Sequence, residues 1–276
     1  MANETFGSPM LGRIWTKTIR DHRRGLLWWS VALVATAFMY AGFYPSIREN
    51  TEVLTDYIET LPEFLKNTFL SESGDFTSPA GYLNTELFSF FAPLLLLIYA
   101  IGAGARATAG EEERRTLDIL LATPTPRRRA VLEKFGALVI GTALLAAALW
   151  VSIAALGPPF ELTPDLTNLA AAVVSCVLLA VSMGALALAV GASTGRRTLA
   201  AGVTGGVAAL SYVLDVLAPS VESLRWLQTV SVFHYYAGNE PLTNGLDPLH
   251  VLVLVGVSAA LLVAALVGFE RRDLAA

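Results

Sequence analysis

Residues 169–192, LAAAVVSCVLLAVSMGALALAVGA, contain no aspartate, glutamate, lysine or arginine. At 1.5 Å per residue, a helix over this stretch is long enough to cross a hydrocarbon core about 30 Å thick. Nothing in the stretch alternates polar and apolar residues as a strand of a membrane barrel does, and a helix satisfies its own backbone hydrogen bonds inside lipid. We therefore predict a membrane-spanning helix here.

Further stretches share this character, and the composition agrees, with 54% hydrophobic and 15% charged residues and a positive mean hydropathy. That balance lies outside the range of ordinary soluble domains. The alternative, a large soluble core of buried helices, is disfavoured because such helices rarely reach this length without a charge. We predict an all-α polytopic membrane protein, a single transmembrane domain over residues 1–276 with six spans near 26–44, 87–105, 135–156, 169–192, 199–217 and 249–269.

The basic residues divide unequally between the two sides of this arrangement. With six spans, both termini and the second and fourth loops share one side, and that side holds 16 of the 19 lysines and arginines. Cytoplasmic loops carry such an excess, so we predict that both termini are cytoplasmic. The first apolar run begins too late and is too long for a cleaved signal peptide.

Three segments outside the spans are too apolar to be plain connections. Residues 9–25 mix apolar and basic side chains, which predicts an interfacial helix in the cytoplasmic headgroup layer, with a plain tail as the alternative. Residues 45–86 have helical apolar spacing interrupted at Pro62, which predicts outer amphipathic helices. Residues 218–248 are apolar and aromatic but broken by Pro241 and glycines. This pattern fits short re-entrant or interfacial helices, and a surface loop with an aromatic belt is an equal alternative.

Asp215 is the one acid placed inside a predicted span, and an intramembrane carboxylate is a candidate functional group by default. Its place beside Leu217 and Pro219 also fits the outer interface, where a charge costs little. Gly202 and Gly206 in the same span form a small face that can pack helices or subunits closely. The candidates for an outer gate are Asp215, Trp226, Phe233, Tyr235 and Tyr236.

Two glycine-rich stretches imitate nucleotide-binding motifs without the required context. GAGARATAG at 102–110 follows a predicted membrane helix and not a strand, so close helix packing explains it better. GASTGRRT at 191–198 has Arg196 where a phosphate loop needs lysine. The three histidines and the single Cys176 are not spaced as metal ligands. We expect no catalytic, cofactor-binding or metal-binding residues in this chain.

The densest charge lies in EEERRTLDILLATPTPRRRAVLEKF, residues 111–135, between the second and third spans. A helical reading gives an apolar stripe of Leu117, Leu120 and Leu121, and this helix ends before Pro124. Thr125 and Pro126 then begin the next helix. The arginines at 127–129 are unfavourable at a helix N-terminus, so an acidic partner such as lipid headgroups or a protein surface is expected.

This loop resembles that of the permease subunit of a type-2 ABC exporter, which carries a glutamate-rich run, then T-L-[DE]-x-L-L-x-T-P and a basic residue. The matching residues are Thr116-Leu117-Asp118, Leu120-Leu121, Thr123-Pro124 and Arg127, while Arg115 stands where the family often has glycine. The resemblance implies a cytoplasmic coupling helix, within region 111–129, that docks into an ATP-binding subunit. The coupling residues are Glu111, Glu112, Glu113, Arg115, Thr116, Leu117, Asp118, Leu120, Leu121, Thr123 and Pro124.

The same resemblance implies the assembly and the activity. Two copies of an ATP-binding cassette subunit would hold ATP and Mg²⁺, and a second permease, identical or different, would complete an export path lined by spans two and five. Membrane lipids, and no nucleic acid, are the other expected partners, in a prokaryotic cell membrane. The expected function is ATP-driven export of an amphipathic small molecule, natural product or lipid, without catalysis in this chain. The alternatives are an ATP-independent secondary transporter or channel, and a membrane scaffold without transport.

Overall fold

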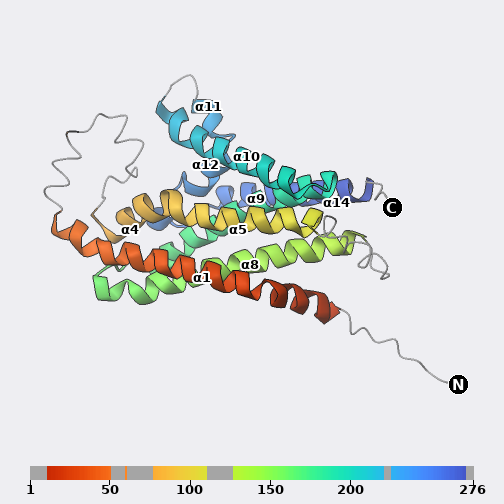
Figure 1. Ribbon diagram of the computed structural model, residues 1–276. Helices are drawn as coiled ribbons and strands as arrows, with labels where there is room; N and C mark the ends of the chain where they lie inside the picture. Colours follow the sequence, from red (N-terminus) through yellow and green to blue (C-terminus); the bar gives the residue numbers. More distant parts are fainter. Residues whose placement is uncertain (1–10, 51–59, 61–76, 111–126, 221–224, 272–276) are drawn as a thin grey trace.

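A computed structural model describes residues 11–50, 60, 77–110, 127–220 and 225–271. All regular structure within these ranges is helical, and the long helices lie roughly side by side along one axis (Figure 1). Six of them are long and apolar enough to cross a membrane, which confirms the predicted all-α architecture. These are Arg24–Glu49, Pro79–Ala107, Arg128–Leu156, Leu166–Thr194, Arg197–Leu217 and Pro248–Arg271.

The first helix, α1, runs without interruption from Leu11 to Glu49 and packs along α8, Arg127–Leu156. The interfacial helix expected over 9–25 is therefore not a separate element. The physical reason is that residues 11–25 contain no proline, and an isolated glycine costs a helix only about 1 kcal/mol. Most of the amphipathic segment expected over 45–86 lies outside the described residues.

The second span consists of three consecutive segments, α4 (Pro79–Tyr82), the π-helix η1 (Leu83–Phe91) and α5 (Ala92–Ala107). It begins eight residues before the predicted position 87. Ser78 caps the start, because its side chain accepts a hydrogen bond from the amide of Gly81 at 3.1 Å, and Pro79 takes the first helical position. The early start places Glu86 inside the helix.

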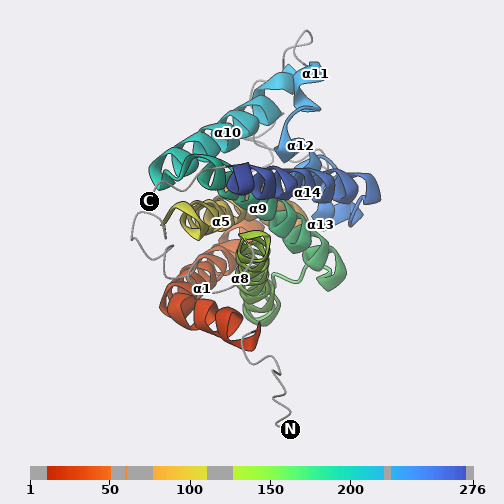
Figure 2. The same ribbon diagram turned by 90° about the vertical axis from the view of Figure 1, so that its right-hand side faces the viewer.

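Helix α9, Leu166–Thr194, lies at the centre of the bundle (Figure 2) and contacts α5, α8, α10 and α14. Asp165 caps its start by accepting hydrogen bonds from the amides of Thr167 and Asn168, both at 2.9 Å. Helix α5 approaches α9 so closely that a Cβ atom on Gly104 would clash with the carbonyl oxygen of Gly184. Gly104, one of the small residues of 102–110, thus serves helix packing.

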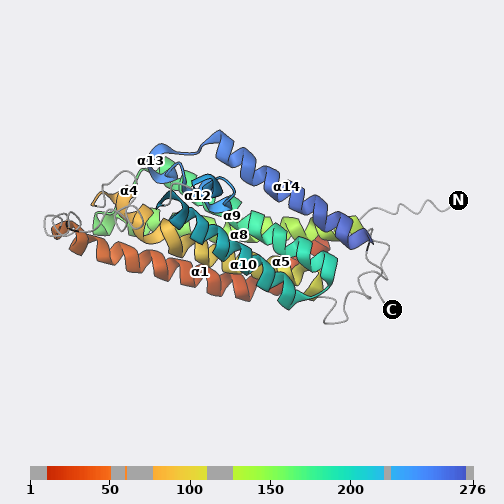
Figure 3. The same cartoon turned by 90° about the horizontal axis from the view of Figure 1, so that it is seen from above.

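Helix α10, Arg197–Leu217, leans away from the bundle and is followed by a series of short helices. Figure 3 shows this series between α10 and the last long helix, α14, Pro248–Arg271. The predicted break of segment 218–248 into short helices is therefore confirmed. The short helices are η3 (Ala218–Ser220), α11 (Arg225–Gln228), α12 (Val232–Ala237) and α13 (Pro241–Asn244).

The two ends of the bundle carry opposite charge. Helix α1 begins and α14 ends at the same end of the molecule (Figure 1), where α5 also ends, α8 begins and α9 is followed by α10. This basic end carries Arg106, Arg128, Arg129, Lys134, Arg196, Arg197 and Arg271. The opposite end, called the acidic end below, carries Glu49, Glu161, Asp165, Asp215, Glu240 and Asp247.

Candidate functional site

The residues predicted to couple to an ATP-binding subunit lie outside the described residues. They are Glu111, Glu112, Glu113, Arg115, Thr116, Leu117, Asp118, Leu120, Leu121, Thr123 and Pro124. The helices that flank them are described, because α5 ends at Ala107 and α8 begins at Arg127, both at the basic end. Helix α8 therefore begins eight residues before position 135, where the third span was predicted to start.

Polar contacts at the basic end hold the flanking helices to each other and to the end of α14. Lys134 donates a hydrogen bond to the carbonyl oxygen of Ala107, so a cation of α8 caps the last turn of α5, where the helix dipole favours positive charge. Arg128 forms a two-point ion pair with Glu270 of α14, with Nη2 and Oε2 3.0 Å apart. The ends of three spans are therefore joined beside the predicted coupling region.

At the acidic end, two of the five gate candidates lie in the core of the bundle. Phe233 and Tyr236 on α12 are 5% and 3% exposed, and their ring centroids are 6.2 Å apart. The hydroxyl of Tyr236 donates a hydrogen bond to the carbonyl oxygen of Phe88 in η1 at 2.6 Å, and it accepts one from Cys176 Sγ of α9 at 3.2 Å. Burial, with Cys176 alongside, raises the pKa of Tyr236 well above its usual value, so this donor keeps its proton.

Helix α12 lies well inside the bundle. Cys176, its contact on α9, is ten residues from the first residue of that helix, which corresponds to roughly 15 Å. Ser231 caps α12 by accepting from the amide of Phe233 at 3.1 Å, and its hydroxyl donates to the carbonyl oxygen of Ser211 on α10 at 2.7 Å. These contacts favour a re-entrant over an interfacial position for α12, because other parts of the protein cover the backbone of this short helix.

The other three gate candidates are not brought to the same place. Trp226 is 64% exposed on α11. Tyr235 points away from Tyr236, with its ring 5.5 Å from that of His250 and its hydroxyl donating to the carbonyl oxygen of Thr229 at 2.9 Å. Asp215 forms a hydrogen bond with Gln228, while its Oδ1 is buried and has no hydrogen-bond partner among the described residues. Asp215 therefore fixes α11 against α10 and stands apart from the Phe233–Tyr236 pair.

A band of aromatic side chains crosses the acidic half of the bundle from α1 to α12. Successive ring centroids along it are 5.1 to 6.4 Å apart, within the range of favourable aromatic contacts. Sequence reasoning identified two of its members and missed the rest, because the band joins helices that are distant in the chain. In order, the members of this aromatic band are Tyr44, Tyr82, Tyr40, Phe91, Phe90, Tyr212, Phe233 and Tyr236.

Glu86, also missed, lies beside this band within the second span. It stands four residues after Tyr82, whose hydroxyl donates a hydrogen bond to the carbonyl oxygen of Tyr40 at 2.9 Å. No ion pair or hydrogen bond to the Glu86 carboxylate is formed within the part of the chain that the structure describes. A signal for it was present in the sequence, since Ser78 and Pro79 mark a helix start that includes residue 86.

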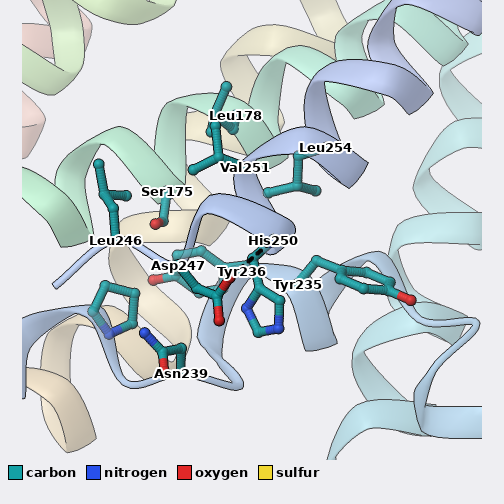
Figure 4. A pocket seen from close by; sticks show the side chains of 11 residues that line it. Ser175, Leu178, Tyr235, Tyr236, Asn239, Leu246, Asp247, His250, Val251 and Leu254 are labelled. Atoms are coloured by element: carbon teal, nitrogen blue, oxygen red, sulfur yellow. Dashed lines mark hydrogen bonds between the residues drawn. The ribbon is translucent and has the colours of Figure 1, made fainter. Parts of the chain in front are cut away.

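A small pocket lies next to α12 on its other side, between α9 and the start of α14 (Figure 4). Ser175, Tyr235, Asn239, Asp247 and His250 give it a polar lining, but it has room only for a water-sized group. Within the described residues, no three of His, Cys, Asp and Glu are grouped as metal ligands. Because the pocket holds only a water-sized group, it is too small to be the route of an amphipathic molecule.

A family model described as ABC-2 family transporter protein matches residues 13–274. The chain belongs to this family. Its members are the membrane subunits of transporters and generally work with an ATP-binding subunit, so this chain is a multi-pass membrane protein and an ABC-2 permease. A search of curated proteins found no match.

Membership of the ABC-2 family covers the whole described bundle, from the start of α1 to the end of α14. The motif around Thr116–Pro124 was the most specific part of the resemblance, and the family match extends over all six spans and the short helices between α10 and α14. Helix α12 and Glu86 both lie within the matched range, and they are candidates for a role in transport.

Proposed function

We propose that this ABC-2 permease is the membrane subunit of an exporter that moves an amphipathic small molecule, natural product or lipid out of a prokaryotic cytoplasm. The energy would come from ATP hydrolysis in a separate subunit, which holds the ATP and Mg²⁺. The observation that carries the proposal is the family match over residues 13–274, on a chain with six apolar spans.

The basic end of the bundle is proposed to face the cytoplasm of the cell. The positive-inside bias supports this orientation, because the lysines and arginines gather where α1 begins and α14 ends. Region 111–129 then lies on the cytoplasmic side, where an ATP-binding subunit can reach it.

Region 111–129 is proposed to contain the coupling helix, which ends before Pro124 and docks one of two ATP-binding subunits. Support comes from the joined helix ends beside it, where Lys134 caps α5 at Ala107 and Arg128 pairs with Glu270. Because these contacts connect α5, α8 and α14, displacement of the coupling helix would move three spans together.

A second permease, identical or different, is proposed to pack against α10 and to complete the export path. One face of α10 is apolar and open, with Leu199, Val203, Leu210 and Val213 exposed by 39–59%. A Cβ atom on Gly202 or Gly206 would meet nothing within 4 Å, so this small face has no partner within the described part of the chain. The path would run between the two permeases, along α5 and α10, with Phe233 and Tyr236 closing it near the acidic end.

The proposal is tested by replacing Leu117, Leu120 and Leu121 with serine in the permease purified with its ATP-binding subunit. We expect weaker co-purification, or ATP turnover that no longer responds to cargo, because the apolar face of the coupling helix is lost. A matched control replaces Leu249, Leu252 and Val255, which are exposed near the acidic end of α14. Unchanged assembly and coupled transport in the first variant would contradict the proposal.

A further inference from the structure

We infer that Glu86 and the tyrosine and phenylalanine rings around it form a binding site for an organic cation, so that the cargo carries a positive charge on an apolar body. This inference rests on the proposed transport function and specifies its substrate class. The reasons are the position of the carboxylate in the second span, the open surface on which it lies, and the side chains that surround it.

The first reason is the depth of Glu86 in the membrane span. Glu86 is seven positions after Pro79, the first residue of the 29-residue span, which corresponds to a rise of roughly 10 Å. A span of this length exceeds a hydrocarbon core about 30 Å thick, and centring the core on it puts Glu86 a few ångströms inside the edge. A carboxylate there costs less than one at the bilayer centre, but it is still stabilised by a cationic partner.

The second reason is that the described part of the protein supplies no cation to this carboxylate. The ion pairs found there are Arg48–Glu161, Arg128–Glu270 and Arg129–Glu133, and none involves Glu86. Arg48, the basic residue at the acidic end of α1, is engaged with Glu161. Within the described ranges no side chain neutralises Glu86, and a cationic cargo would supply the missing charge.

The third reason is the open surface beside Glu86. A π-helix bonds residue i to residue i+5, so Phe90 and Phe91 lie about one turn further along η1 than Glu86. Both phenylalanines are about two-fifths exposed, although Phe90 contacts Tyr212 of α10 and Phe91 contacts Tyr40 of α1. Their rings extend between α1 and α10, and Glu86 borders this surface.

The chemistry of these groups selects a cation with an apolar body. A carboxylate attracts an ammonium or phosphonium group, and the faces of Tyr and Phe rings add cation–π attraction. Exposed phenylalanine rings provide the apolar contact that an amphipathic molecule requires. A metal ion is disfavoured, because Glu86 is not grouped with two further His, Cys, Asp or Glu side chains within the described residues.

The test uses the full-length permease in nanodiscs of zwitterionic lipid and measures equilibrium binding of tetraphenylphosphonium, with empty nanodiscs as background. We expect saturable binding, weakened about 10-fold by Glu86→Gln, which removes the charge at constant size. Glu86→Asp should retain most of the affinity. Glu49→Gln, which removes an exposed acid at the end of α1, is the matched control and should bind as the wild type does.

Tetraphenylborate has the same shape and the opposite charge, and it should not compete for the site. Equal phosphonium binding by wild type and Glu86→Gln, no saturable binding at all, or equal competition by tetraphenylborate would overturn the inference. Binding is measured without ATP and without the second subunit. Failure of the coupling test therefore leaves this result interpretable, and failure here leaves ATP-driven transport of an uncharged cargo intact.

Discussion

Replacing Tyr236 with phenylalanine removes one hydroxyl and keeps the ring contact with Phe233, 6.2 Å between centroids. That hydroxyl connects three elements, since it donates to Phe88 of η1 and accepts from Cys176 of α9. Leaving a buried polar group unpaired costs about 1–3 kcal/mol, whereas hydrogen bonds between membrane helices average about 0.6 kcal/mol. We expect Tyr236→Phe to lower the free energy of unfolding by about 1–2 kcal/mol, or the melting temperature by about 2–6 °C.

The assay is thermal unfolding of the purified permease in detergent. Tyr235→Phe on the same helix is the matched control, because its hydroxyl makes a more exposed bond, to Thr229 at 2.9 Å, and its loss should cost less than about 0.5 kcal/mol. A double-mutant cycle with Cys176→Ala should show coupling between positions 176 and 236. Equal melting temperatures for the two phenylalanine variants would refute the reasoning about α12.

Three further sets of substitutions each test a separate part of the structure. Gly104→Ala should destabilise the monomer by about 1–3 kcal/mol, because the added Cβ would clash with the carbonyl oxygen of Gly184. Gly202→Ala should leave monomer stability unchanged, because its Cβ would meet nothing within 4 Å, but it should weaken the pairing of permeases measured by cross-linking. Arg128→Glu should reduce cargo-stimulated ATP turnover, and adding Glu270→Arg should restore it if that ion pair transmits motion. Ser231→Ala should cost about 1 kcal/mol in thermal unfolding and increase protease cleavage near α12, and no change in either would contradict its role as the cap of α12.

The number and order of the spans could be predicted because an uncharged run of sufficient length has few alternatives to a membrane helix. The ends were harder. The second span was predicted from residue 87 because a search for uncharged runs stops at Glu86, yet the helix begins at Pro79. Backbone capping by Ser78 decides that boundary, because its side chain accepts a hydrogen bond from the amide of Gly81 and Pro79 takes the first helical position.

The candidate site could be predicted only in part. Phe233 and Tyr236 were identified as aromatic residues of a broken outer segment, and both lie in the core contacts of α12. Cys176 seemed uninformative in the sequence, since it has no second cysteine, but it contacts Tyr236 across 60 positions. Such contacts depend on how α9, α12 and η1 pack, which no local pattern of residues records.

The central claim is tested most directly in inside-out membrane vesicles that contain the permease and its ATP-binding subunit. Uptake of a fluorescent cationic amphiphile into the vesicle lumen is followed after ATP is added on the exposed cytoplasmic side. The account predicts uptake that requires ATP and disappears when Leu117, Leu120 and Leu121 are replaced with serine. Uptake driven by an ion gradient without ATP, and unaffected by these substitutions, would contradict it and identify a secondary transporter.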